Sequence, residues 1–454
     1  MSEQRRHPPK EDLARFIRAD LESSRRNDVV GHLLKGCDAC AAALSHKPSI
    51  REVVNYEKCM NRVEMACALF ETNIETERQL GFQLWDLLDS KTAESRLLIV
   101  RNDRRFQIWG LFDHILGKIR PTSRKDPFGA VDLAHLAVTI TQLLVEEDYG
   151  SERLHDFRGA AYNLLGFAMR NAGDFVGAKS AFEGARTELQ QGTGDPIEAA
   201  MLAVHSGSLL FDLGEFAGAL RLLNDAIRLF RRAGDSHGMG LTFVKQAMIL
   251  AHTATPEKGL LLAEKGLSLL DLGGQPRGEL AAHDARAWCY NALGDHEEAL
   301  RIVSTHEYLY KYFDDEPAIQ GKHEWLLGRI QAGRRELGKS LRHLNTAYQV
   351  FLGAFLYFDA VLVDLNRIEV LLYLRQGAEA MSIANRLAPL LEAWGLGNET
   401  LRLWAMMTTS IAAGEFLVKQ HSHSFESHLR KHWIPRPTGA DFASRASRRS
   451  VQSS

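Results

Sequence analysis

The sequence is short of the residues that mark several large protein classes. Of its 454 residues only 12 are proline and five are cysteine, and long runs of β-branched residues are absent. Leu, Ala, Arg and Glu are frequent instead, and all four suit helices. The small, odd number of cysteines does not fit a disulfide framework. The fold class that we predict is therefore all-α.

The chain also lacks a strong charge of either sign and a hydrophobic run that could span a membrane. Lys and Arg total 55 against 57 Asp and Glu, a formal net charge of −2. The longest apolar stretch, around Val350 to Leu365, is interrupted by Asp359 and Asp364. We therefore expect neither a membrane nor a nucleic-acid partner. The first residues contain no apolar segment of a secretory signal, which predicts a cytoplasmic location.

What the sequence does contain is an internal repeat. Three segments combine a small residue, a glycine, an acid and a ring: NAGDF at 171–175, DLGEF at 212–216 and ALGDH at 292–296. A small residue follows each glycine at a fixed distance, and the register continues along the chain at steps of 39 to 41 residues, through Ala178, Ala219, Gly259, Ala299 and Gly338. A looser sixth copy contains Gly377 and Ala380.

Each part of this pattern has a physical role in a helical hairpin. A glycine just past a helix end can adopt the left-handed conformation that ends the helix, and the acid after it can cap the next helix. The small residue lets the two antiparallel helices approach closely. Because one hairpin cannot bury its apolar face alone, the copies must stack on one another.

The pattern resembles the tetratricopeptide repeat over roughly residues 150–415. A period of about 40, longer than the family's usual ~34, implies longer helices. The resemblance implies an α-solenoid, a rod of stacked hairpins with a long groove lined by the first helix of each hairpin. We expect a partner peptide or helix to bind there. The candidate groove residues are Asn163, Phe167, Arg170, His205, Lys245, Arg286 and Asn291.

No catalytic motif accompanies the repeat. The sequence has no phosphate-binding glycine loop, and the residues around Ser206 do not form a serine elbow, because Val204 and Ser208 occupy the positions that require glycine. The function predicted first is therefore a non-enzymatic protein–protein interaction scaffold with a regulatory role.

A metal site is predicted near the N-terminus. His32, Cys37 and Cys40 lie within nine residues, and thiolates and imidazole are the ligands that zinc prefers in tetrahedral sites. A closed site needs a fourth ligand, for which His7 and His46 are the alternatives. The other three cysteines, Cys59, Cys67 and Cys289, have apolar neighbours and are expected in the core.

The metal motif resembles the zinc-binding domain of bacterial anti-sigma factors, whose pattern is an upstream His followed by His-x3-Cys-x2-Cys. Here His7, His32, Cys37 and Cys40 occupy the four ligand positions, with one extra residue between His32 and Cys37. The resemblance implies an alternative function, a transcriptional regulator whose zinc module sequesters a sigma factor. In a redox-responsive version, oxidation of the cysteines releases the Zn2+.

These features divide the chain into four regions. We predict an anti-sigma-like zinc module at 1–48, helices with degenerate repeats at 49–150, the repeat array at 151–415 and a polar basic tail, partly disordered, at 416–454. Binding of nucleic acid through that tail is a further alternative, which salt-dependent binding to DNA would reveal.

Overall fold

The computed structural model describes residues 7–17, 20–22, 25–26, 29–30, 32, 73–253, 255–271, 276–393 and 408. Throughout these residues the regular elements are helices, and no strand occurs among them. The all-α prediction is confirmed. No helix in the described ranges is long and apolar enough to cross a membrane. The chain forms two compact units, Met1–Leu80 and Gly81–Ser454.

The first unit contains helix α1 (Lys10–Ile17) and a small apolar core. Leu13 on α1 packs with Leu21 and Val29, and Phe16 covers this group from one side. The helix is amphipathic, with acidic side chains in its first turn where they complement the helix dipole.

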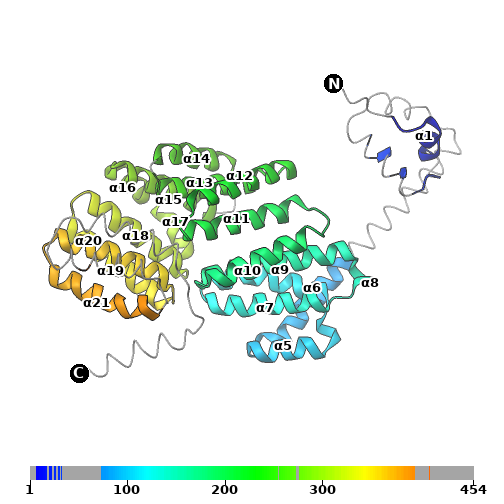
Figure 1. Ribbon diagram of the computed structural model, residues 1–454, viewed down its shortest axis with the longest axis horizontal. Coiled ribbons are helices and arrows are strands. Elements are labelled where there is room, and N and C mark those ends of the chain that lie inside the picture. Colours follow the sequence, from blue (N-terminus) through cyan, green and yellow to red (C-terminus); the bar gives the residue numbers. More distant parts are fainter. Residues whose placement is uncertain are drawn as a thin grey trace. The chain divides into compact units, whose positions relative to one another are not determined.

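The larger unit consists of helices packed in consecutive pairs (Figure 1). It begins with the helical residues 81–89, continues through helices α5 to α8, and then forms the pairs α9–α10, α11–α12, α13–α14, α15–α16, α18–α19 and α20–α21. This pairing is consistent with a helical solenoid. The bounds are α5 (Ala93–Asn102), η1 (Arg104–Phe106), α6 (Trp109–Ser123), α7 (Pro127–Leu143), α8 (Glu146–Tyr149), α9 (Ser151–Asn171), α10 (Phe175–Leu189), α11 (Pro196–Asp212), α12 (Phe216–Ala233), α13 (Ser236–Ala251), α14 (Pro256–Leu269), α15 (Pro276–Leu293), α16 (His296–Thr305), α17 (Glu307–Tyr310), η2 (Lys311–Phe313), α18 (Pro317–Gly333), α19 (Leu337–Gly353), α20 (Tyr357–Tyr373) and α21 (Gly377–Ala393).

The turns inside the pairs explain the glycines of the repeat. Gly173, Gly214 and Gly294 have φ of 83°, 73° and 84°, in the left-handed region expected of a residue that ends a helix. Arg335 and Arg375 take the same position after α18 and α20, with φ of 65° and 60°. The turn geometry is therefore kept in hairpins that have lost the glycine.

The second helix of each pair has a buried small residue at its fourth position. These residues are Ala178, Ala219, Gly259, Ala299, Ser340 and Ala380, at steps of 41, 40, 40, 41 and 40. The expectation of Gly338 was therefore wrong by two residues. Gly338 is exposed, with open space where a side chain would begin. Ser340 is fully buried, and its Oγ donates to the Gly328 carbonyl at 2.7 Å.

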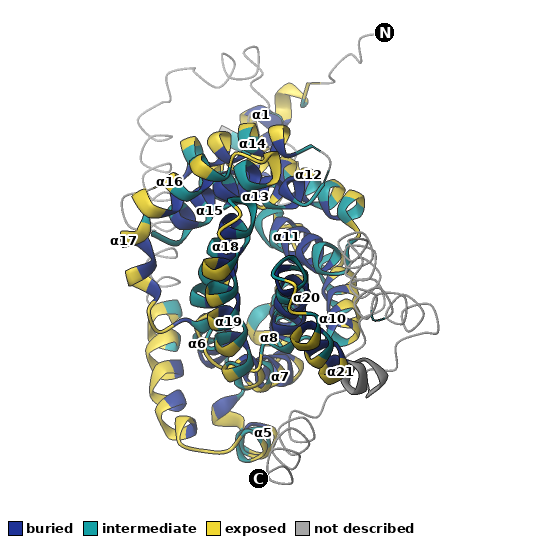
Figure 2. Cartoon of the chain, turned by 90° about the vertical axis from the view of Figure 1, so that its left-hand side faces the viewer, coloured by how far each residue is buried: buried dark blue, intermediate teal, exposed yellow. Residues whose placement is uncertain are grey.

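The solenoid curls until its late hairpins meet its early ones, so the expected open rod is not what forms. The Phe175 ring at the start of α10 packs edge-to-face against Phe358 of α20, with ring centres 5.4 Å apart and both side chains buried. An ion pair between Lys125 and Asp315 joins the end of α6 to the segment before α18. Figure 2 shows the helices of this unit arranged around a common interior.

Candidate binding cavity

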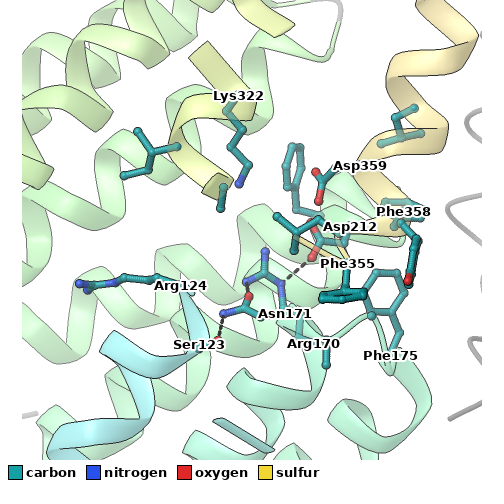
Figure 3. A pocket seen from close by; sticks show the side chains of 18 of the residues that line it. Ser123, Arg124, Arg170, Asn171, Phe175, Asp212, Lys322, Phe355, Phe358 and Asp359 are labelled. Carbon is teal, nitrogen blue, oxygen red and sulfur yellow. Dashed lines mark hydrogen bonds and ion pairs between the residues drawn. The ribbon is translucent and has the colours of Figure 1, made fainter. Parts of the chain in front are cut away.

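The curled superhelix forms a partly open cavity of about 500 Å³. Ligand pockets typically measure roughly 300–1,000 Å³. Figure 3 shows side chains from the end of α6, the α9–α10 turn, α18 and the start of α20 around this space. Its polar and aromatic lining includes Ser123, Arg124, Arg170, Asn171, Asp212, His252, Arg277, Asp284, Trp288, Glu316, Lys322, Trp325, Phe355, Phe358 and Asp359.

A chain of hydrogen bonds forms one wall of the cavity. Arg170 Nε donates to Asp212 Oδ2 at 2.5 Å, and Arg170 Nη1 donates to Asn171 Oδ1 at 3.3 Å. Asn171 Nδ2 in turn donates to Ser123 Oγ at 2.8 Å (Figure 3). The chain connects α6, α9 and α11, so it fixes the orientation of the Arg170 guanidinium relative to three helices.

A buried carboxylate also lines the cavity. Glu316, directly before α18, pairs with Arg277 of α15 and lies 3.7 Å from Arg124 Nη1 at the end of α6. Its Oε2 is buried and accepts no hydrogen bond from the described residues. Burial and the neighbouring Arg277 lower the pKa of Arg124, although Glu316 opposes the shift. Glu316 therefore joins Arg124, at the end of the early helix α6, to Arg277 of the later helix α15.

Two lysines lie on the first helices of this region, of which Lys322 lines the cavity and Lys245 does not. Lys322 of α18 points into the cavity (Figure 3) and makes no hydrogen bond or ion pair with the described part of the chain. Lys245 of α13 lies 3.4 Å from the Ser208 hydroxyl. The Lys245 side chain is exposed to solvent, but many protein atoms lie around its amino group and partly desolvate it. This burial, with the Arg170 charge, lowers the pKa of Lys245 to about 8.

Asp284, whose pKa is raised, also lines the cavity. The Tyr310 hydroxyl donates to Asp284 Oδ1, and burial raises the pKa of Asp284 to about 7 although this hydrogen bond opposes the shift. Near neutral pH the Asp284 side chain is thus present both as acid and as carboxylate. Trp288, one turn further along α15, packs edge-on against Trp325 with ring centres 5.9 Å apart.

Replacing Asp284 with asparagine should stabilise the protein more at pH 7 than at pH 4. The pKa of Asp284 is raised on folding, so between about pH 4 and 7 the native state holds a proton that the unfolded state has released, and wild-type stability falls as pH rises. Asparagine removes this fall and can still accept from Tyr310. Urea unfolding of both proteins across this range measures the difference, and a difference independent of pH would contradict the assignment.

The structure brings five of the seven predicted groove residues together on neighbouring first helices. Arg170 lines the cavity. Asn163 Oδ1 lies 2.9 Å from His205 Nδ1, and the Phe167 and His205 rings are 5.0 Å apart. Lys245 follows on the next first helix, and burial lowers the pKa of His205 well below its usual range.

The other two predicted groove residues lie elsewhere on α15. Arg286 Nη1 is 3.3 Å from His283 Nδ1, and Asn291 Oδ1 is 2.8 Å from His296 Nδ1 at the α15–α16 turn. Neither residue is part of the cavity lining, to which α15 contributes Arg277, Asp284 and Trp288 instead.

Several lining residues were missed by sequence reasoning. Arg124 and Glu316 are nearly two hundred positions apart, and they meet because the superhelix closes. A local signal was present for two others: Asp212 and Trp288, like the predicted Arg170, lie in the last two turns of a first helix. A rule that selects the polar and aromatic residues just before each turn would have identified these lining residues.

In the N-terminal unit, two of the predicted zinc ligands lie close together. The His7 and His32 rings are 5.3 Å apart, edge to face. His32 Nε2 is buried and has no hydrogen-bond partner among the residues that the structure describes. Cys37, Cys40 and the alternative ligand His46 lie outside the described residues, as do Cys59 and Cys67. Within the described ranges, no group of three or more potential metal ligands occurs. Cys289, the remaining cysteine, is fully buried as expected.

Comparison with known proteins gives no family to which the chain can be assigned. No protein-family model matches the sequence, and no curated protein matches it either. The functional argument therefore depends on the residues of the cavity and of the N-terminal unit.

Proposed function

We propose that this protein is a non-enzymatic, tetratricopeptide-like binding protein that holds a partner peptide inside its closed superhelix. The paired helices, the spacing near 40 residues and the buried small residue of each hairpin support the repeat assignment. Repeat arrays use their extended concave surfaces for binding, and we assign this one the role of a regulatory scaffold.

The observation that carries this proposal is the convergence of polar and aromatic side chains from separate hairpins on one cavity. A cavity that served packing alone would be apolar, whereas this one contains Lys322, Arg170 and Asp212. An α-helix with side chains is about 10–12 Å wide, so about 500 Å³ accommodates little more than one helical turn. The sequence predicted either a peptide or a helix as the partner. A short extended peptide therefore fits this cavity better than a helix.

Lysine cross-linking tests the location of the binding site. The protein would be mixed with a library of short random peptides, washed, treated with an amine- and carboxyl-reactive cross-linker, and digested for mass spectrometry. We expect retained peptides to be linked to Lys322 inside the cavity and not to Lys258, an exposed lysine on the second helix α14. Retention without interior cross-links, or no retention at all, would contradict the proposal.

We further propose that His7, His32, Cys37 and Cys40 hold one structural Zn2+, with His46 as the alternative to His7. Two imidazoles that share a tetrahedral zinc at the usual Zn–N distance have ring centres roughly 5 Å apart, and those of His7 and His32 are 5.3 Å apart. The unpartnered His32 Nε2 would then be a metal ligand. The small core of this unit gives the ion a large share in its stability. An anti-sigma role remains the alternative function of this module.

Metal analysis should find about one zinc per chain, and His32→Ala should reduce it to a trace, because the loss of one of four ligands typically abolishes a closed site. Comparing His7→Ala with His46→Ala identifies the fourth ligand, since only the true ligand should release the metal. Zinc-free wild-type protein from a zinc-supplemented preparation would eliminate the site.

A further inference from the structure

A ladder of aromatic rings runs along one wall of the cavity. Four successive first helices or their ends each contribute one ring: Phe211 of α11, His252 directly after α13, Trp288 of α15 and Trp325 of α18. The ring centres follow one another at 5.5, 5.3 and 5.9 Å. The first three side chains are only half-buried, so part of each ring is accessible to a ligand.

A further ring lines the cavity from a strained backbone position. Phe355, between α19 and α20, has a φ of 60° and a side chain that is 49% exposed (Figure 3). Gly234 makes the same backbone hydrogen bonds after α12, with a φ of 74°. Glycine adopts this left-handed conformation freely, whereas a bulky side chain makes it unfavourable. Because such strain concentrates at binding sites, an exposed aromatic residue at this position indicates contact with a ligand.

Two hydrogen-bond donors of the lining have no acceptor. Trp288 Nε1 and Lys322 Nζ make no hydrogen bond or ion pair with the described residues. Neighbouring acids are engaged elsewhere, since Asp212 accepts from Arg170 and Glu316 lies between two arginines. The lining as a whole contains four basic and five acidic side chains, so its charge is nearly balanced. A ligand that fits therefore brings neutral acceptors and apolar surface, and needs no net charge.

These features favour a peptide whose backbone offers carbonyl groups and few N–H groups. A peptide in a β-strand conformation also brings N–H donors, and the described part of this unit has no sheet edge to accept from them. A proline-rich segment in the polyproline II conformation lacks many of these donors and leaves its carbonyls free. Its proline rings also pack well on aromatic side chains.

We propose that the cavity recognises proline-rich, extended peptide segments, whose proline rings pack on the aromatic ladder and on Phe355 while peptide carbonyls accept hydrogen bonds from Trp288 Nε1 and Lys322 Nζ. This inference rests on the proposed peptide-binding function and names the chemical class of its ligand.

An apolar peptide without proline is the competing ligand, and the structure favours it less. Its side chains could cover the aromatic rings equally well. Each of its residues, however, adds an N–H donor to a site that already has two donors without an acceptor, and a donor left without a partner costs free energy. The composition of selected peptides distinguishes the two ligands.

The test selects peptides from the random library with four full-length proteins: wild type, Phe355→Gly, Arg375→Gly and Trp288→Phe. Arg375 has the same φ of 60° in the turn after α20 and is not part of the cavity lining, so its variant is a matched control for the glycine substitution. Trp288→Phe keeps a ring in the ladder and removes the N–H group. Circular dichroism verifies that each variant keeps its helices. Fluorescence polarisation measures the affinity of the selected peptides and of versions with alanine in place of proline.

We expect wild type and Arg375→Gly to enrich proline-containing peptides and to bind them equally. Phe355→Gly should bind them about tenfold more weakly because one packed ring is lost, and Trp288→Phe about fivefold because one hydrogen bond is lost. Alanine in place of the peptide prolines should weaken binding to wild type about tenfold. Retained peptides without enrichment in proline, or full affinity in either cavity variant, would overturn the inference and leave the proposed function intact. If no peptide is retained, both fail.

Discussion

Phe358→Ala should open the superhelix between α10 and α20. Phe358 is 9% exposed and packs on Phe175, which is 4% exposed. Truncating a buried phenylalanine costs about 3–5 kcal/mol. Because this contact joins hairpins that are distant along the chain, its loss weakens the closure while each hairpin keeps its neighbours. Hydrogen exchange measured by mass spectrometry should show faster exchange at the starts of α10 and α20.

Phe230→Ala is the matched control for this prediction. Phe230 is 2% exposed and packs within the α11–α12 region, away from the closure. Its loss should cost a similar free energy and raise exchange around α12, with α20 unchanged. Equal exchange at α10 and α20 in wild type and Phe358→Ala would mean that the closure does not depend on this contact. Peptide binding should weaken in Phe358→Ala and persist in Phe230→Ala if the cavity is the binding site.

The second large effect is expected at a buried ion pair. The Asp364 side chain is fully buried in α20, where Oδ1 lies 2.5 Å from Arg367 Nη1 and Oδ2 lies 3.2 Å from Arg386 Nη2 of α21. Arg367→Met removes the more buried of the two arginines and leaves the buried carboxylate with only the half-exposed Arg386 as a charged partner among the described residues. Breaking a buried pair in this way costs about 3–5 kcal/mol.

Arg228→Met tests whether burial, and not the loss of an arginine, produces the effect. Arg228 pairs with Asp225 at the same spacing of three residues, but the two side chains are 69% and 46% exposed. Exposed pairs contribute about 1 kcal/mol or less. Urea unfolding followed by circular dichroism, with exchange in α20 and α21 as the local measure, should separate the variants. Similar losses from both would refute the role of burial.

The pH dependence of Arg367→Met follows from the pKa of Asp364. Burial raises this pKa above its usual value even with both arginines present. Without Arg367 it should rise further, so protonation below neutral pH relieves part of the penalty. The destabilisation should therefore be larger at pH 7 than at pH 5.

The hairpin scaffold could be predicted from the sequence because its signals are local. Gly173, Gly214 and Gly294 each end a helix, and a single residue type that tolerates positive φ makes such ends visible. The later hairpins have Arg335 and Arg375 at the same position. The glycine pattern is therefore lost there, although the turn geometry is kept. Because of that loss of signal, the spacing predicts Gly338 in place of Ser340.

The cavity could be predicted only in part. The inner faces of α9, α11 and α13 follow from the rule that first helices line the groove, and Arg170, His205 and Lys245 lie there. The closure does not follow from any repeat, because small rotations between successive hairpins add up along the array. The pairing of Arg124 with Glu316 depends on the rotation accumulated over the hairpins between them. No local feature of a single sequence reveals that total rotation.

The contact between Phe175 and Phe358 also constrains how this gene could have changed length. Open arrays gain and lose whole units by duplication and deletion, since each unit touches only its neighbours. A duplicated unit between α11 and α18 would carry Phe358 past Phe175 and separate Arg124 from Glu316. Selection would therefore hold the number of units between these residues constant, and leave copy number free to vary only outside them.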